Sequence, residues 1–249
     1  MKKVKVRIPA TVANLVCGFD IRGMAINEPF DEMEVTLSDE PGIRIRHLDH
    51  FGLPEEPGKN VAGVALQSLL DVYGNQTGFN LVVHKHIKPG SGLGSSAAAA
   101  AGAVVAANML LNGQFSNEQL IEFAMNGEEL ASGSRHADNI APCIYGGITL
   151  VRSVSPMDIT SIPSLPLFVT VIHPQIEVKT AEARKILPVM VPLKDAVRQW
   201  GNVAGLLTGL FKNDLPLIKR SLEDVLVEPV RSKLIFGFDT IKKNCMEAG

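Results

Sequence analysis

The stretch KPGSGLGSSAAAAAG, residues 88–102, constrains the fold of this chain more than any other. Three glycines and three serines occupy the positions from Gly90 to Ser96, and a run of alanines follows at once. The apolar residues of 79–87 predict a strand before the stretch, and the alanines predict a helix that begins near Ser95. A helix start carries free N–H groups and the positive end of a dipole, and glycines let an anion approach the backbone. The order strand, glycine loop, helix therefore predicts a phosphate-binding loop.

Two familiar phosphate motifs do not fit this loop. The glycines at 90, 92 and 94 follow the spacing GxGxG, not GxGxxG, and no Lys-Ser or Lys-Thr pair comes after them. On composition alone, a glycine- and serine-rich turn that binds nothing stays the alternative.

The rest of the chain reads as an α+β protein with two domains. Its 249 residues, 46% of them hydrophobic, suffice for one large core or two modest ones. Alternating and buried patterns predict strands at 4–8, 33–37, 42–48, 79–87, 146–151 and 167–174. Helical spacing predicts helices at 60–74, 95–112, 117–130, 193–211, 215–226 and 232–247, and Ser116 with Gln119 forms a capping box. A Pro- and Ser-rich stretch at 153–166 sets the domains at 1–155 and 156–249.

Composition narrows the class of partner. The net charge is −2, without the excess of Lys and Arg that is typical of nucleic-acid-binding proteins. No apolar stretch is long enough to cross a bilayer. The three cysteines are far apart in the sequence, which is typical of reduced thiols in a cytoplasmic protein. We therefore expect neither nucleic acid nor membrane as a partner.

Three blocks of the sequence resemble the motifs of the GHMP kinases. PGSGLGSSAA at 89–98 resembles their phosphate-loop motif, IPATVANLVCGFD at 8–20 resembles the PATxANLGxGFD signature of the homoserine kinase family, and SRHADNIAP at 134–142 resembles that family's HxDNVAP block. The resemblance spans nearly the whole chain. It implies a two-domain GHMP kinase fold, with a ribosomal protein S5 domain 2-like N-terminal domain and a ferredoxin-like C-terminal domain.

The resemblance also implies an activity. It points to phosphorylation of the side-chain hydroxyl of L-homoserine by ATP with Mg²⁺, giving O-phospho-L-homoserine in threonine biosynthesis, in a cytoplasmic homodimer. By the resemblance the ATP phosphates bind along one run of residues: Pro89, Gly90, Ser91, Gly92, Leu93, Gly94, Ser95, Ser96 and Ala97. Asn60 is expected near the adenine.

Ser96 and Glu128 are the expected magnesium ligands. Magnesium in kinases takes one or two protein oxygens together with phosphates and water. Ser96 stands at the predicted helix start, and the resemblance places a metal-binding glutamate at Glu128. Glu129, beside it, is the rival ligand, and the alternative for Glu128 is a solvated helix residue.

Further residues are expected around the amino-acid substrate. Asn14 and Asp20 follow the first predicted strand, where turn chemistry is their alternative role, and by the resemblance they contact homoserine together with His136. Arg184 and Arg231 occur in the family contexts TxEAR and EPxR and are expected to hold the carboxylate, because the guanidinium fork matches its geometry. Thr180 would add a hydroxyl contact.

The catalytic base stays open at this point. Some GHMP kinases use an aspartate near the third block, where this chain has Asn139, so catalysis would depend on positioning and electrostatics. Asp138 is the alternative base.

The C-terminus departs from the GHMP pattern. The chain stops at CMEAG, where the third, glycine-rich motif would begin, so we expect the natural protein to be longer and the second domain to be incomplete here. Two rival functions remain: another GHMP kinase, such as a mevalonate-type enzyme, and a nucleotide-binding protein without catalysis. The two arginines and the HADN block favour an amino-acid acceptor.

Overall fold

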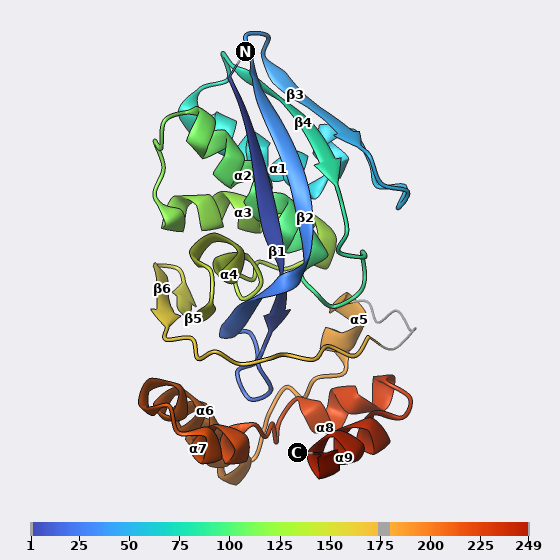
Figure 1. Ribbon diagram of the computed structural model, residues 1–249, viewed down its shortest axis with the longest axis vertical. Helices are drawn as coiled ribbons and strands as arrows, with labels where there is room; N and C mark the ends of the chain where they lie inside the picture. Colours follow the sequence, from blue (N-terminus) through green and yellow to red (C-terminus); the bar gives the residue numbers. More distant parts are fainter. Residues whose placement is uncertain (1, 174–179, 249) are drawn as a thin grey trace. The chain divides into compact units, whose positions relative to one another are not determined.

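The computed structural model describes residues 2–173 and 180–248, which form two compact units (Figure 1). The N-terminal unit comprises the chain up to Asn14 and Asp20–Pro163, and the C-terminal unit comprises Leu15–Phe19 and the chain from Ser164 onward. The short segment 15–19 thus belongs to the second unit, although it lies near the start of the chain.

A six-stranded mixed sheet forms one layer of the N-terminal unit. Its strands are β1 Lys3–Ala13, β2 Arg22–Ser38, β3 Gly42–His47, β4 Gly78–His84, β5 Ile148–Val154 and β6 Met157–Ile162. The order is β3-β4-β2-β5-β6, and β1 pairs with β2. The long strand β2 organises the sheet, because β1, β4 and β5 all pair with it in antiparallel register.

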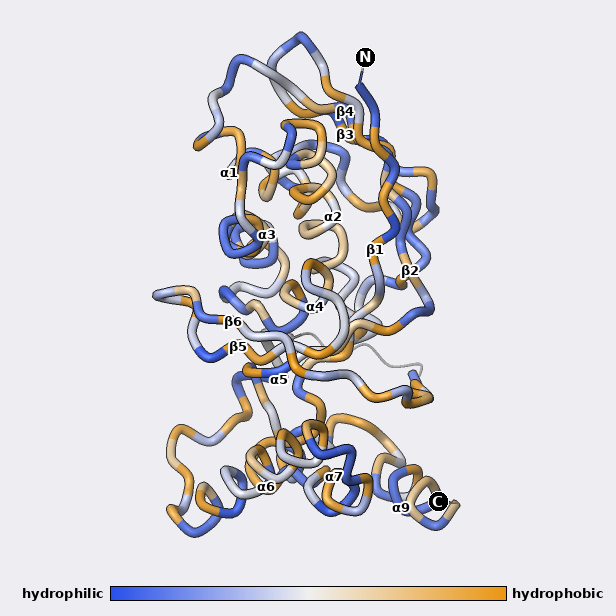
Figure 2. Tube along the Cα trace, turned by 60° about the vertical axis from the view of Figure 1, so that its left-hand side comes forward, coloured by the Kyte–Doolittle hydropathy of each residue, from blue (hydrophilic) through white to orange (hydrophobic). Residues whose placement is uncertain are grey.

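Side chains along these strands alternate between a buried and a solvent-facing side, as the pleat of a strand requires. Ile8, Met33 and Val35 are buried in the core. On the outer face Lys3 pairs with Glu34 at 3.0 Å and Lys5 with Glu32 at 2.9 Å. The tube in Figure 2 shows this alternation of hydrophobic and hydrophilic positions along β1 and β2.

Helices form the second layer of the N-terminal unit. They are α1 Val61–Tyr73, preceded by the 3₁₀ turn η1 Pro57–Lys59, then α2 Ser95–Leu110, α3 Asn117–Ser132 and α4 Ile140–Tyr145. Helix α2 contacts β1 and β2 as well as α1, α3 and α4, and twelve of its sixteen residues are buried. A helix that is enclosed on every side needs small side chains, which explains the alanine run. At Gly102 a Cβ would come within 2.5 Å of the Ile8 side chain on β1.

Most elements predicted for the N-terminal unit are confirmed. The capping box is present, with Gln119 N–H donating to Ser116 Oγ and Ser116 N–H donating to Gln119 Oε1. Strand β6 was not predicted, because Pro156 interrupts the apolar pattern of the hairpin β5–β6. This hairpin extends the N-terminal unit to Pro163, past residue 155.

Helices are the regular elements of the described C-terminal unit. They are α5 Thr180–Lys185, α6 Leu193–Lys212, α7 Leu215–Ser221, α8 Glu228–Arg231, the 3₁₀ turn η2 Ser232–Leu234 and α9 Phe238–Ala248. The predicted strand 167–174 is wrong over its described residues, 167–173, which have no regular structure. A strand needs a hydrogen-bonding partner, and no other strand occurs among the residues described for this unit. The expected ferredoxin-like sheet therefore has no counterpart in this part of the chain.

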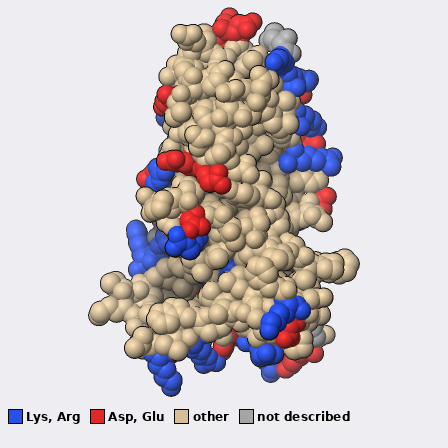
Figure 3. Space-filling view, turned by 90° about the vertical axis from the view of Figure 1, so that its left-hand side faces the viewer, with Lys and Arg blue, Asp and Glu red and all other residues tan. Residues whose placement is uncertain are grey.

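Charges on the surface are dispersed. On the face shown in Figure 3, charged side chains stand in small groups of both signs. None of the described helices is long and apolar enough to cross a membrane.

The contact between β2 and the start of α4 yields a test of the packing. At Gly23 an added Cβ would lie 1.6 Å from the backbone oxygen of Asp138. Gly23→Ala must therefore displace the start of α4, and we expect it to lower the free energy of unfolding by about 3 kcal/mol, measured by denaturant titration. Gly58→Ala is the control, because a Cβ there meets nothing within 4 Å. Equal midpoints for the two variants would contradict this packing.

Candidate active site

The loop between β4 and α2 has the backbone of an anion-binding site. Gly90, Gly92 and Gly94 have φ values of 74°, 76° and 67°, in the left-handed region that favours glycine. Gly94 is the N-cap of α2 and has no side chain to bond the first-turn N–H groups. These N–H groups and the positive end of the α2 dipole are therefore available to a phosphate at Ser95, Ser96 and Ala97.

Two neighbouring elements fix the far end of this loop. Thr11 N–H on β1 donates to Leu93 O at 3.1 Å, and Thr11 Oγ1 donates to Asn139 Oδ1 at 2.8 Å. A Cβ on Gly94 would lie 2.0 Å from Thr11 Oγ1 and 3.0 Å from Asn139 Oδ1. The absence of a side chain at Gly94 thus lets β1, the loop and the start of α4 meet.

A buried ion pair fixes the near end. Lys85 Nζ contacts Asp31 Oδ2 in an ion pair whose side chains are each 2% exposed. Asp31 Oδ1 also accepts from the N–H groups of His86 at 2.7 Å and Ile87 at 2.8 Å, while Lys85 Nζ donates to Ser95 O at 2.9 Å. Ser95 Oγ donates to Ile87 O at 2.8 Å. The pair therefore ties β2, the end of β4 and the first residue of α2 together.

Ser96 and Glu128, the predicted metal ligands, lie together. The Ser96 side chain is hydrogen-bonded to the Glu128 carboxyl group. Helix α3 approaches α1 closely at Gly127, where a Cβ would lie 2.3 Å from Val61 O, and this contact sets the position of Glu128. Glu129, the rival ligand, is exposed and lies near Arg135, with Oε2 and Nη1 3.9 Å apart.

The carboxyl group of Glu128 is in a place that favours its neutral form. Its pKa is raised from 4.5 to about 7, mainly by burial; the Ser96 hydrogen bond offsets part of the rise, and the nearby charge of Asp138 adds to it. Its Oε2 atom is buried without a hydrogen-bond partner among the described residues. A hydroxyl and a buried carboxylate oxygen lacking a partner fit a hard cation such as Mg²⁺.

Asn14, Asp20 and His136, predicted to contact the substrate, also converge. Asn14 Oδ1 accepts from the Asp20 N–H at 3.0 Å, and Asp20 Oδ2 lies 4.0 Å from His136 Nδ1. Asn14 and Asp20 have φ values of 71° and 62°, which asparagine and aspartate tolerate better than most residues. Asn14 and Asp20 can therefore form the turn and also contact a substrate.

Asp138 and Asn139 stand at the start of α4. Asp138 is 5% exposed, and its Oδ1 accepts from the Asn139 N–H at 3.1 Å. Asn139 is held by Thr11 and has no ionisable side chain, so it cannot act as a base.

Arg184 and Arg231 converge within the C-terminal unit. Their guanidinium carbons lie 5.3 Å and 5.9 Å from the centroid of the Phe19 ring, within range of a cation–π contact. The segment around Phe19 is held by Gln199, whose Nε2 donates to Cys17 O at 2.9 Å. Asp224 accepts from three N–H groups at the start of α8, which carries Arg231.

Asn60 has a local structural role. Its Oδ1 accepts from the N–H groups of Ala62 at 2.9 Å and Gly63 at 3.4 Å, and its Nδ2 donates to Pro54 O at 2.6 Å. It is therefore the N-cap of α1, and its place near an adenine stays a prediction. The side chain of Thr180 lies outside the part of the chain that the structure describes.

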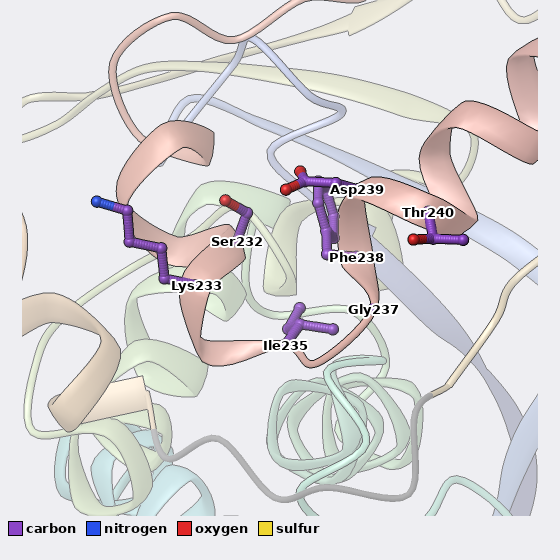
Figure 4. Close-up of a pocket in the computed structure, with 7 residues that line it drawn as sticks. All are labelled: Ser232, Lys233, Ile235, Gly237, Phe238, Asp239 and Thr240. Atoms are coloured by element: carbon purple, nitrogen blue, oxygen red, sulfur yellow. The ribbon is translucent and has the colours of Figure 1, made fainter.

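A separate hollow of about 220 Å³ lies in the C-terminal unit (Figure 4). It is lined by Ser232, Lys233, Ile235, Gly237, Phe238, Asp239 and Thr240, from η2 to the start of α9. None of the predicted site residues lines it.

Several residues that shape the site were missed from the sequence. Asp31 and Lys85 could have been found from the sequence, because each stands at a buried position of an alternating pattern. Asp31 is two residues from Met33, and Lys85 is two residues from Val83. Thr11 lies within the first family block, but its contacts could not be read from strand alternation, because a bulge after Pro9 shifts the register of β1. Gln199 and Asp224 bond to segments distant in sequence or to local backbone, which no motif marks.

Comparison with known proteins shows the family of this chain. The profile of the GHMP kinases N terminal domain matches residues 60–147. The homoserine kinase of Chlorobium phaeobacteroides is 43% identical over 100% of this chain and 82% of its own length, and that of Methanococcus maripaludis is 42% identical over 98% and 81%. The crystal structure of homoserine kinase from Cytophaga hutchinsonii matches with a TM-score of 0.90 at 46% identity, over all of this chain and 80% of that one. The phosphate loop and the Ser96–Glu128 pair are consistent with these relatives. By these identities, the chain belongs to the homoserine kinase family of the GHMP kinases.

Proposed function

We propose that this chain transfers the γ-phosphoryl group of ATP to the side-chain hydroxyl of L-homoserine, giving O-phospho-L-homoserine for threonine biosynthesis. The observation that carries the proposal is the identity of 43% to a homoserine kinase over the whole of this chain, and the proximity of Ser96 to Glu128 supports it. In the transfer, the bond from the γ-phosphorus to the bridging oxygen would break and ADP would leave with that oxygen, a bond to the homoserine oxygen would form, and the hydroxyl proton would pass to water.

The residues 89–97 would bind the phosphates of ATP. Their backbone N–H groups and the start of α2 provide donors and a positive dipole end without any lysine in the loop. Ser96 and Glu128 would hold Mg²⁺ against the phosphates, where the ion supplies charge neutralisation. Glu128 would bind the ion as a carboxylate. Because burial favours its protonated form, metal binding would release that proton.

Charged groups would orient the amino-acid acceptor. The carboxylate of Asp20 suits the ammonium group of homoserine, with His136 and Asn14 beside it. Arg184 and Arg231 would bind the substrate carboxylate through their guanidinium forks. Both guanidinium groups lie near the ring of Phe19, which directly precedes Asp20 in the sequence.

Catalysis would depend on alignment and charge stabilisation more than on a strong base. Asn139 cannot accept the hydroxyl proton, and Asp138 Oδ1 is engaged by a backbone N–H. In phosphoryl transfer, little bond formation precedes phosphorus–oxygen cleavage, so positioning can suffice. The homodimer and the cytoplasmic location stay predictions.

A direct assay tests the function. ADP release from ATP and Mg²⁺ should depend on added L-homoserine and should not rise with mevalonate. ATP binding with no release on any alcohol would instead indicate a nucleotide-binding protein, and release with mevalonate alone would indicate the other kinase class.

Glu128→Gln should separate stability from activity. The folded pKa of about 7 lies above the ordinary value of 4.5, so the folded state binds the proton more tightly than the unfolded chain does. The wild type thus loses stability as pH rises from 4.5 to about 7, on the order of 3 kcal/mol in the metal-free protein. In the variant this loss should be absent, measured by thermal unfolding across pH, while phosphoryl transfer falls roughly a hundredfold or more.

Glu129→Gln is the matched control for this experiment, because Glu129 is exposed beside the same site. It should change neither the pH dependence of stability nor the rate. If both variants lost activity equally, Glu128 would not be the metal ligand.

Arg231→Met should weaken homoserine binding selectively. Loss of a charged hydrogen-bonding group costs about 1.5–3 kcal/mol, so the KM for homoserine should rise roughly ten- to a hundredfold while the KM for ATP stays near the wild-type value. Arg198→Met is the control, since Arg198 is paired with Glu223 on the surface of the same unit. A similar rise in both KM values would argue against the carboxylate role.

A further inference from the structure

Two short sequences place three potential metal ligands on the outer face of the sheet. Phe30-Asp31-Glu32 lies in β2, where alternate side chains point to opposite faces, and His84 is the last residue of β4, followed directly by Lys85 and His86. Asp31 and Lys85 point inward and form the buried pair. Glu32, His84 and His86 therefore share the other face, and the register of β2 with β4 sets Glu32 directly opposite His84. Both strands lie side by side in Figure 1.

The three side chains lie close together. One ligand atom from each of Glu32, His84 and His86 lies within 4.8 Å of the other two. The two imidazole rings have centroids 4.2 Å apart. Tetrahedral zinc with bonds of about 2.0–2.1 Å needs ligand atoms about 3.4 Å apart, which small side-chain rotations would provide. His86 is exposed and has room for such a rotation.

Basic side chains lie beside the Glu32 carboxylate, so a metal ion bound there would compete with them for its oxygens. Lys5 Nζ and Arg7 Nε lie 2.9 Å and 3.6 Å from Glu32 Oε1, and in the described chain no ion pair uses Oε2. Lys5 is thus the nearest competitor of a cation for the Glu32 carboxylate.

We propose that Glu32, His84 and His86 form a binding site for a divalent transition-metal ion of the zinc class. Two imidazoles and one carboxylate are ligands that Zn²⁺ accepts, whereas Mg²⁺ prefers oxygen alone. Three protein ligands leave the fourth position to water. This site goes beyond the proposed kinase function and uses none of its residues.

The backbone supports this site from the inner face. The N–H of His86 donates to Asp31 Oδ1 at 2.7 Å, and the side chain of Lys85, between the two histidines, is buried in the ion pair. The main chain that carries both imidazoles is thereby held at a fixed register against Glu32. The Phe30 and His86 rings also make an edge-to-face contact, with centroids 6.1 Å apart.

Titration of the full chain with Zn²⁺ alone, without nucleotide, tests the proposal. We expect one ion per chain by calorimetry, with the ring NMR signals of His84 and His86 shifting and that of His50 unchanged. His84→Ala and His86→Ala should each weaken binding at least about tenfold. His50→Ala is the matched control, because His50 is exposed and outside the cluster. Equal affinity in His84→Ala and His50→Ala, or no binding at all, would overturn the proposal.

Lys5→Met provides a test by gain of affinity. Removing the ammonium group that lies 2.9 Å from Glu32 should free the carboxylate and tighten Zn²⁺ binding several-fold, roughly the value of one exposed ion pair. This variant keeps every ligand and the fold, so unfolding cannot explain a change. Weaker or unchanged binding in Lys5→Met would mean that Glu32 is not a ligand, against the proposal.

Discussion

The buried ion pair between Asp31 and Lys85 is the interaction on which the phosphate loop depends. Burying two charges costs several kcal/mol per ion in general and is offset only when further hydrogen bonds complete the pair. Here Asp31 also accepts from two backbone N–H groups, and Lys85 also donates to the first residue of α2. Loss of one partner would leave a buried charge at the point where the strand passes into the loop. The position of the helix start, and with it Ser96, follows from this pair.

The same register serves both faces of the sheet. Because side chains alternate, the pairing that brings Asp31 to Lys85 on the inner side brings Glu32 to His84 on the outer side. A slip of one residue between β2 and β4 would place Lys85 in solvent and the histidines in the core. The inner ion pair therefore also determines the geometry of the outer cluster, although the two groups share no side chain.

Much of this could be predicted from the sequence, where local patterns were decisive. The glycine loop, the alanine helix and the capping box depend on neighbours within a few residues, and the family resemblance marked Ser96, Glu128, Asp20 and His136. The contacts of Thr11 could not be predicted, because a β-bulge changes which side of β1 faces inward. The strand predicted at 167–174 was wrong over 167–173, the part that the structure describes, because a hydrophobic run cannot indicate whether a partner strand exists. Gln199 connects segments 182 residues apart, and such contacts leave no local pattern.

Glu128 illustrates a conflict between stability and function within one side chain. Without a cation, its buried Oε2 lacks a partner in the described structure, and Asp138 adds repulsion, so the ionised form destabilises the fold. A folded chain selected for stability alone would have a neutral residue at this position. A cation bound there, as we propose for Mg²⁺, would reverse the balance, because it would satisfy the orphaned oxygen and offset both carboxylates. The raised pKa and the missing partner are thus two consequences of one arrangement, the burial of one carboxylate near a second.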